Sequence, residues 1–461
     1  MPSFALPVLS NRHTEFQTQN ILVRDQDGRL HFAPITRRAP TLPPEILAEI
    51  FIHCLPALGF VTPDPAEPPL ALCAICRWWR EVALSTPRLW SSLLVDFDDM
   101  PTNNTDVDLY RKWLSRARGA PLSISLKDWD EKEVLTSVDP ILQTFVGLSR
   151  QWKNIEIDVG MNLARSIFPV DGDFPLLERL TVSVHASELS ISFCDAPKLR
   201  QVSIPIYNPH IQVPWYQLTT LRIANISVPG CIEILRNASN LLDGTFEVAG
   251  NPPDVATSIV HHNSLRKLSL GAMINQDHNV NPMPVLSFLN IPGLKSLTLE
   301  FRNWDTTGAE DVSTFSSFVS RSSAQLDTLA LSSMPATTQD LIECLKATPS
   351  LRNLKLDPAH RLVNMDRVFS QFTGDSKFLP KLQSLHFVLD PVFVTPFAVV
   401  DMLSWRWASS GITQLKFFRF AHGHNQRSVD GALKSHPEYR RLEMEGMELY
   451  VGDRSLVDTF L

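Results

Sequence analysis

The sequence predicts an α/β protein in which a small helical module precedes a long array of repeated strand–helix units. Two observations lead to this fold class. Apolar residues recur at three- and four-residue steps between residues 42 and 93, the spacing of amphipathic helices. A six-residue signature, apolar-x-x-apolar-x-apolar, then returns at intervals of 19 to 33 residues. A recurring unit of this length is typical of a solenoid, in which each unit buries its apolar side chains against its neighbours.

Length, charge and cysteine content limit the classes of function. A chain of 461 residues favours a small module plus a large repetitive one. The net charge of −7 argues against a nucleic-acid partner. No uninterrupted apolar stretch is long enough to span a membrane, and the first residues do not resemble a secretory signal. Since the cysteines are mostly far apart, we expect a reducing compartment, cytoplasmic or nuclear.

The first two segments are a leader and the helical module. Residues 1–40 are polar and without a sustained period, so we expect a flexible leader with one short strand at 21–23. The module is expected at residues 41–98. Pro43 and Pro44 favour the start of its first helix, because proline tolerates the first helical turn. A unit this small cannot bury all of its apolar surface, so part of that surface must meet another domain or chain.

Three sequence blocks in the module carry a family resemblance. They are L-P-P-E-I-L-x-x-I-F from Leu42, C-R-x-W-R from Cys76 and P-x-L-W from Pro87. In this order the blocks resemble an F-box, although the stretch 56–69 is longer than the loop of compact F-boxes. An ordinary helical hairpin of a protein core is the alternative. The resemblance implies docking on the Skp-type adaptor of a cullin–RING ubiquitin ligase, with Trp113 and Leu114 as candidates to cover the module's inner side. The residues implied in or directly behind the adaptor interface are Leu42, Pro43, Ile46, Leu47, Ile50, Phe51, Leu55, Cys76, Arg77, Trp79, Leu89 and Trp90.

The repeat array is expected over residues 99–461. It begins with a helical stretch at 108–117 and an alternating strand at 122–126. Helix-like segments lie between later copies of the signature, including 341–346 after Thr337 or Thr338 and 255–261 after Asp254. The copies of the signature start at Trp152, Leu177, Leu199, Leu218, Leu241, Leu265, Leu294, Leu326, Leu351, Leu382 and Leu415.

The array resembles a leucine-rich-repeat domain, and the combination resembles the F-box/leucine-rich-repeat proteins common in fungi. The resemblance implies a right-handed β/α solenoid with a parallel inner sheet and outer helices. One loop position of the family usually holds Asn or Cys, whose side chain satisfies backbone groups. Because other residues stand there, the array is degenerate, and we do not expect regular curvature. These residues are His185, Tyr207, Met273, Met334, Ala359 and Asp390.

Catalytic and metal sites were sought in the same pattern. A β/α-barrel hydrolase is the enzymatic alternative, because Asp158, Glu300, Asp357 and Asp390 follow strands as catalytic carboxylates of barrels do. The strand count exceeds eight, so we interpret these carboxylates as solvent-facing or capping.

Three short spacings resemble metal or redox motifs. Cys73-x-x-Cys76, His261-His262 and His422-Gly423-His424 lack a matching second pair, which favours packing and surface roles. The sequence therefore predicts no catalytic, cofactor-binding or metal-binding residues, and a protein that is not an enzyme.

Target binding is expected on the concave, strand-lined face of the solenoid. Strand side chains alternate, so the residues between the leucines point away from the core. They mix both charge signs with hydroxyls, which suits a protein partner. The alternative, that they are solvated and the target binds a loop edge, stays open. The outward residues are Glu156, Thr181, Ser203, Arg222, Ser269, Thr298, Lys355, His386 and Arg419.

These features predict the substrate-recognition subunit of a cullin–RING (SCF-type) ubiquitin ligase. Its partners would be the Skp-type adaptor and a target protein, with no nucleic acid and no membrane. A solenoid scaffold that has an F-box but no ligase role is the alternative outside this class, and the barrel hydrolase is the less favoured one.

Overall fold

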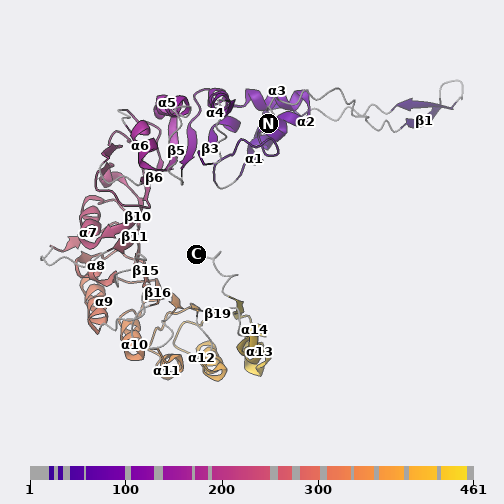
Figure 1. Cartoon of the computed structure of the whole chain (residues 1–461). Helices are drawn as coiled ribbons and strands as arrows, with labels where there is room; N and C mark the ends of the chain where they lie inside the picture. The colour runs from indigo at the N-terminus through magenta and orange to yellow at the C-terminus, as the bar shows by residue number, and fades with distance from the viewer. Residues whose placement is uncertain are drawn as a thin grey trace. The chain divides into compact units, whose positions relative to one another are not determined.

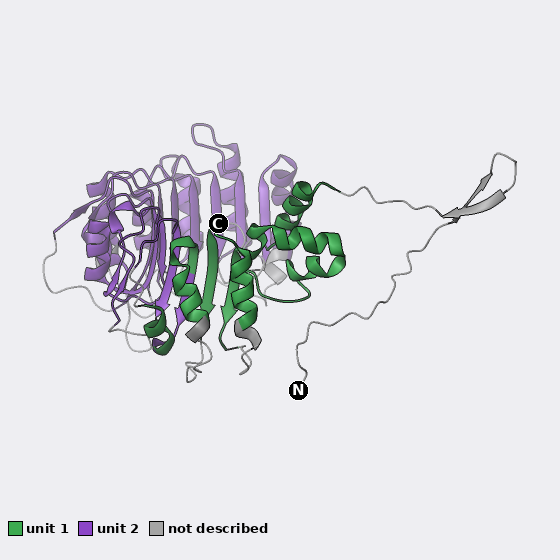
Figure 2. Cartoon of the chain, turned by 90° about the horizontal axis from the view of Figure 1, so that it is seen from above, with its two compact units in different colours: residues 1–155, 162–171 green, residues 156–161, 172–461 purple. Residues whose placement is uncertain are grey.

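The structure is a computed structural model with an α/β fold. It describes residues 20–24, 30–34, 42–56, 59–98, 105–128, 139–168, 172–184, 189–249, 258–272, 281–301, 309–333, 337–357, 363–388, 394–422 and 427–453. Two compact units divide the chain, residues 1–155 with 162–171 and residues 156–161 with 172–461 (Figure 2).

Unit 1 contains a hairpin, the helices α1 to α5 and the first strands of a large sheet. The hairpin pairs β1 (Asn20–Arg24) with β2 (Leu30–Pro34), whereas the sequence predicted a single strand there. The remaining elements are α1 (Pro44–His53), α2 (Leu70–Ile75), α3 (Arg77–Ser85), η1 (Pro87–Trp90), β3 (Ser92–Asp96), α4 (Thr105–Arg116), β4 (Leu122–Lys127), α5 (Asp139–Gly147) and η2 (Ser149–Gln151). Two further elements, β5 (Trp152–Val159) and α6 (Met161–Ile167), contain residues of both units.

Unit 2 alternates strands with helices or short arcs. Its first half contains β6 (Arg179–Val184), β7 (Ile191–Ser192), β8 (Gln201–Ile204), β9 (Ile211–Gln212), η3 (Trp215–Gln217), β10 (Thr220–Ser227), α7 (Val228–Asn237), β11 (Asp243–Ala249), β12 (Val260–His261), β13 (Lys267–Ala272), α8 (Met283–Ser287) and β14 (Leu289–Asn290). Its second half contains β15 (Ser296–Glu300), α9 (Ala309–Ser322), β16 (Thr328–Ser332), α10 (Thr338–Lys346), β17 (Asn353–Asp357), α11 (Met365–Gly374), β18 (Ser384–Val388), α12 (Pro396–Ala408), β19 (Phe417–His422), α13 (Arg427–Ser435), α14 (Pro437–Met444) and β20 (Glu448–Asp453).

The large sheet has fourteen strands in the order β3-β4-β5-β6-β8-β10-β11-β13-β15-β16-β17-β18-β19-β20. Strands that follow one another in the chain are therefore neighbours, and they pair in parallel. Parallel neighbours need a crossover between them, and in unit 2 the helices lie on one face of the strands (Figure 1). Since β3 and β20 are the edges of the described sheet, it is open. The barrel alternative is therefore wrong.

The leucines of the signature form the core of unit 2. Leu268, Leu297, Leu329, Leu354 and Leu385 are direct partners on five successive strands, and each is at most 2% exposed. A second column of apolar partners runs beside them, two residues later. Each strand thus buries alternate side chains against its neighbours and the helices, as the repeated sequence predicts.

Three details differ from the sequence-based expectations or lie outside the described residues. Val260 and His261 belong to strand β12, which pairs with β14, so the helix expected at 255–261 is wrong at its end. The sheet starts at Ser92, before the expected module boundary at residue 98. Of the loop positions compared with the repeat family, Tyr207 is half-buried. The others, His185, Met273, Met334, Ala359 and Asp390, lie outside the described residues, as do Asp254 and His424.

Candidate functional site

The first candidate site is formed by α1 to α3. Pro43 lies at the N-cap of α1 and Pro44 occupies its first turn, where a missing N–H costs no hydrogen bond. The rings of Phe51 and Trp79 lie 4.9 Å apart, which joins α1 to α3. On the remaining face of α1, the described structure leaves Ile46 and Ile50 exposed.

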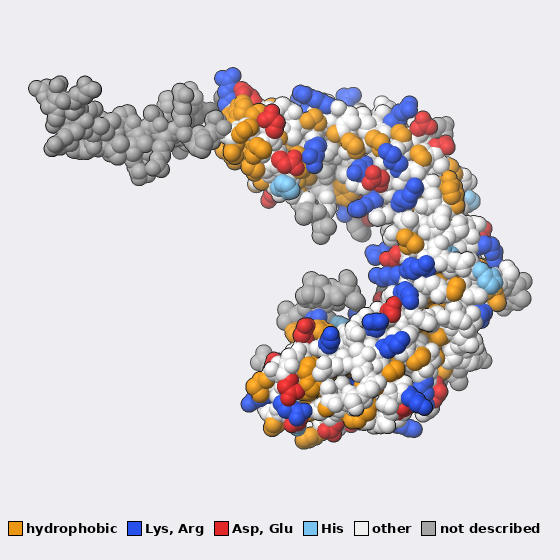
Figure 3. All heavy atoms as spheres, turned by 180° about the vertical axis from the view of Figure 1, so that it is seen from behind, with side chains coloured by type: hydrophobic (Ala, Val, Ile, Leu, Met, Phe, Trp, Pro, Cys, Tyr) orange, Lys and Arg blue, Asp and Glu red, His pale blue; other side chains and the backbone are white. Residues whose placement is uncertain are grey.

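Large apolar side chains are exposed on this face. Leu42, Ile46 and Ile50 follow one another at the four-residue spacing of a helix and are 43 to 52% exposed. Ile75 and Trp78, where α2 meets α3, are 58% and 38% exposed. We call these five residues the apolar surface of α1 to α3. Figure 3 shows the hydrophobic side chains gathered at this end of unit 1.

Four of the residues expected in or directly behind the adaptor interface are buried inside unit 1. Leu47, Phe51, Leu89 and Trp90 are at most 3% exposed, so they can only support a contact surface from behind. The indole of Trp90 donates to the carbonyl of Ala83 at 2.9 Å, which ties η1 to α3. Of the other expected residues, Pro43, Cys76 and Arg77 are exposed, and Leu55 and Trp79 are half-buried.

Trp113 covers the inner side of the helical module, as the sequence analysis expected. Its ring packs edge-on against Trp90 at 4.9 Å, and its indole N–H donates to the carbonyl of Ser92 at 3.1 Å. Both Trp113 and Leu114 are buried. The apolar surface of α1 to α3 therefore remains as the uncovered side.

The paired cysteines have ordinary structural roles. The Cys76 sulfur accepts the backbone N–H of Trp79 and caps α3. Burial raises the pKa of the Cys73 thiol, which favours its protonated, unreactive form. Among the described residues, no group of three or more His, Cys, Asp and Glu side chains could hold a metal ion.

The second candidate site is the helix-free face of the sheet in unit 2. Eight of the nine residues expected to bind a target lie in one row, in which each residue is the register partner of the next on the neighbouring strand. The row also contains three residues that the sequence analysis did not name. We call this the middle row, and its members are Thr181, Ser203, Arg222, Thr245, Ser269, Thr298, Ala330, Lys355, His386, Arg419 and Tyr450. The ninth, Glu156, lies on β5 and is half-buried.

Exposure differs strongly along the middle row. Arg222 is exposed, whereas Arg419 is only 6% exposed, with its guanidinium 4.6 Å from the ring centre of Tyr450. Arg419 is therefore a packed residue and not the outward contact that the sequence predicted. Burial, together with the charges of Lys355 and Arg419, lowers the pKa of His386 to about 4, so this histidine is neutral at physiological pH.

A second row lies three residues earlier, directly before the first residue of each strand. Its members are linked by backbone hydrogen bonds, for example from Lys295 N–H to Arg266 O and from Arg352 N–H to Asp327 O, at 2.8 and 2.9 Å. We call this the strand-start row. Its members are Glu178, Arg200, Thr219, Leu242, Arg266, Lys295, Asp327, Arg352, Gln383 and Lys416.

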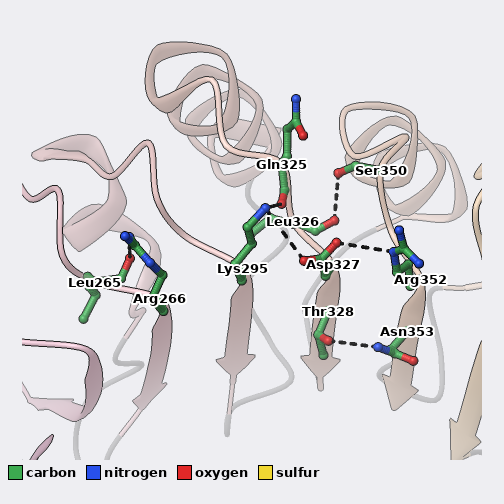
Figure 4. Close-up of polar contacts among 10 residues, drawn as sticks. All are labelled: Leu265, Arg266, Lys295, Gln325, Leu326, Asp327, Thr328, Ser350, Arg352 and Asn353. Atoms are coloured by element: carbon green, nitrogen blue, oxygen red, sulfur yellow. Dashed lines mark hydrogen bonds and ion pairs between the residues drawn. The ribbon is translucent and has the colours of Figure 1, made fainter.

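The strand-start row has a net positive charge, because five of its ten members are Arg or Lys and two are acidic. Figure 4 shows Asp327 between two cations, 3.8 Å from Lys295 Nζ and 3.7 Å from Arg352 Nε. Arg266 instead donates to the carbonyl of Asn263 at 2.8 Å, and its guanidinium lies over Gly293. A Cβ at Gly293 would overlap that guanidinium, so the glycine leaves the space that Arg266 occupies.

The opposite end of the strands carries acidic residues. Glu300 pairs with Gly271 on one side and with Ser332 on the other, and Asp357 is the next partner along. Glu247 extends the same row on β11. Glu300 and Asp357, which were considered for catalysis, thus form one row with Glu247. The charge of this row is opposite to that of the strand-start row.

The sequence-based prediction missed the strand-start row although its signal is simple. The row occupies the second position of the signature, as in L-R-K-L-S-L, L-K-S-L-T-L and L-R-N-L-K-L. Only side chains between the leucines inside the strand were expected to be accessible, and the residue before the strand was not considered.

Comparisons with known proteins add no family assignment. No protein-family model matches the chain, and no curated protein matches it. Within the described residues, no helix is both long and apolar enough to cross a membrane.

Proposed function

We propose that this chain is the substrate-recognition subunit of a cullin–RING (SCF-type) ubiquitin ligase. In this proposal α1 to α3 are an F-box that binds a Skp-type adaptor, and the strand–helix array is a leucine-rich-repeat-like solenoid that binds the target protein. The chain would perform no chemistry itself. It would raise the effective concentration of the target near the ligase.

The apolar surface of α1 to α3 is the observation that carries the proposal. Five large apolar side chains are exposed in the segment that holds the three F-box-like sequence blocks. A contiguous exposed apolar patch marks an interaction site, and such interfaces depend on a few apolar anchors. An ordinary core hairpin, the alternative, would bury these side chains within its own unit.

The test is co-purification of the full-length chain with a Skp-type adaptor. Replacing Ile46 and Ile50 together by Asp should abolish adaptor capture, since a buried carboxylate in an apolar interface is costly. Leu42 and Pro43 replaced together by Ala should weaken it. A matched control is Phe397→Asp, because Phe397 is a large exposed apolar residue on α12 of unit 2.

The outcomes separate the proposal from its alternative. Adaptor capture that survives Ile46→Asp with Ile50→Asp would reject the F-box assignment. Adaptor capture by the wild-type chain without ubiquitination of any bound protein would favour a scaffold without a ligase role.

A further inference from the structure

The cations of the strand-start row are largely unneutralised. Within the described part of the chain, Arg266 and Lys416 have no carboxylate partner. Asp327 is shared between Lys295 and Arg352 at long distances, and all three side chains are about half exposed. Ion pairs of this kind contribute little and are easily exchanged for other partners. The row therefore offers positive charge to an anionic ligand, and Figure 3 shows Lys and Arg side chains gathered on unit 2.

The row also has an apolar step at one end. Leu242 directly precedes Arg266 in the backbone ladder and is 46% exposed. Beside it, Asn240 Nδ2 donates to the carbonyl of Tyr216, whose side chain is 63% exposed. The neighbouring leucine of the signature, Leu241, is fully buried. The exposed side chain of Leu242 at the end of the cationic row can therefore meet one apolar side chain of a ligand.

The acidic row at the other end of the strands limits what can bind. A nucleic acid or another broad polyanion would bring negative charge against Glu300 and Asp357 as well as against the cations. Asp327 interrupts the cations, which also disfavours a uniformly charged ligand. A narrow ligand confined to the strand starts avoids both conflicts.

From these features we infer that the strand-start row from Leu242 to Lys416 binds an extended, Asp/Glu-rich segment of the target, with one apolar residue of that segment against Leu242. The inference deepens the proposed function and rests on it. Neighbouring strands are about 4.8 Å apart, so the six steps from β11 to β19 span roughly 29 Å. An extended peptide of about nine residues has this length.

The test is fluorescence anisotropy of the full-length chain with a labelled nine-residue peptide that has Leu at one end and alternating Glu and Ser after it, made in both orientations. We expect one orientation to bind, with affinity that falls as salt rises. Replacing Arg266, Lys295 and Arg352 together by Glu should weaken binding at least about tenfold. A matched control replaces the exposed helix and loop cations Arg367, Lys377 and Lys434 by Glu and should leave binding unchanged.

Asp327→Asn gives the sharpest discrimination. The substitution removes the ion pairs of Asp327 with Lys295 and Arg352. If these ion pairs only stabilised the fold, the variant would bind the acidic peptide equally well or more weakly than the wild type. Our inference predicts tighter binding of the acidic peptide by about two- to fivefold, because the only acid between the cations is removed. Replacing the peptide's Leu by Ser should weaken binding to the wild type but not to Leu242→Ser.

Several results would overturn the inference. The first is that neither acidic peptide binds at about 100 μM, and the second is that a Lys-containing peptide binds as tightly as the acidic one. The others are that Asp327→Asn binds the acidic peptide more weakly than the wild type, or that the matched control loses as much binding as the triple Glu variant. Thermal melting of each variant checks folding. Adaptor co-purification is measured on the same samples. Retained adaptor capture without peptide binding rejects this inference alone, and peptide binding without adaptor capture rejects the ligase role alone.

Discussion

The helices of unit 1 and the repeats of unit 2 differ in how far their apolar residues are buried. In the repeats, Leu268, Leu297 and Leu329 are covered completely, because each strand is packed between two others and a helix. On α1, Ile46 and Ile50 remain about half exposed although they belong to an equally regular apolar pattern. The same kind of periodicity thus forms a core in one region and a surface in the other.

This difference indicates two kinds of interaction surface. An exposed apolar surface suits a partner that stays bound and excludes water. The strand-start row, by contrast, is charged and half-exposed, with ion pairs that can be exchanged. Such a surface contributes selectivity and association rate more than tight binding. The contrast is consistent with the proposed function, in which an adaptor would stay bound and a target would be captured and released.

The largest expected effect tests the contrast directly with a matched pair of truncations. Leu297→Ala should destabilise unit 2 by about 2–5 kcal/mol, because it removes a fully buried side chain and leaves a cavity. Ile46→Ala should change stability by less than about 0.5 kcal/mol, since about half of the residue is already exposed to water and its loss leaves no enclosed cavity. Urea denaturation followed by circular dichroism measures both. A large loss for Ile46→Ala would mean that this residue belongs to a core.

The second effect concerns a buried cation that joins two repeats. Arg406 on α12 is fully buried, and its guanidinium donates to the carbonyls of Leu379, at 2.9 Å, and Phe378. Burial lowers its pKa to about 10, so it stays charged at neutral pH. Arg406→Ala should cost about 3 kcal/mol, because two buried carbonyls lose their donors. Arg406→Met restores volume without donors; full recovery of stability by Met would show that only packing matters.

The third effect is a loss of stability in mild acid, caused by two histidines. Nδ1 of His262 accepts the N–H of Leu265 at 3.1 Å, so Nε2 carries the proton that faces Ala238 O at 2.9 Å. Burial lowers the pKa of His262, and burial with two nearby cations lowers that of His386 to about 4. The unfolded chain therefore binds more protons below about pH 6.5. Stability is complete above that pH and falls as the pH drops towards 4.

The measurement is the urea midpoint of the wild type and of His386→Asn at pH 7.5 and pH 5. We expect the wild type to lose about 1 kcal/mol more than the variant, a value reduced for solvent screening because His386 is half-buried. Equal losses in both chains would show that His386 does not contribute to the acid sensitivity.

Much of the fold could be predicted from the sequence because the repeat is local and periodic. The spacing of the leucines determines which strand side chains are buried, and each copy from Leu199 to Leu415 leads into a strand of the sheet that starts two residues later. The predicted helix at 341–346 lies within α10. Strand β20 was missed, because Gly446 stands where the signature has its leading apolar residue. Strand β3 was missed although Trp90, Leu93 and Val95 follow the signature, because these residues were assigned to the helical module.

The candidate sites were harder to predict, because exposure depends on neighbours that the sequence does not show. Trp90 belongs to a block that resembles an interface motif, yet it packs against Trp113 and is fully buried. Arg419 occupies an outward strand position but is covered. Arg406 has the sequence pattern of a surface cation on an amphipathic helix. No local pattern shows that two carbonyls of the preceding repeat accept its hydrogen bonds.

The smallest effect separates a link within one repeat from a link between two. Thr337 caps α10, since its hydroxyl accepts the N–H of Asp340 while the Asp340 carboxylate accepts the N–H of Thr337. The hydroxyl of Thr338 instead accepts the N–H of Asn364, the N-cap of α11 in the next repeat, at 2.8 Å. Each Thr→Ala change should cost about 1 kcal/mol.

Hydrogen exchange distinguishes the two substitutions. Thr337→Ala should speed exchange at the start of α10, and Thr338→Ala should speed it at the start of α11. Thr337→Ser, which keeps the hydroxyl, should leave both rates close to those of the wild type. The same pattern of exchange in both alanine variants would contradict these separate roles, because it would mean that the two helices open as one unit.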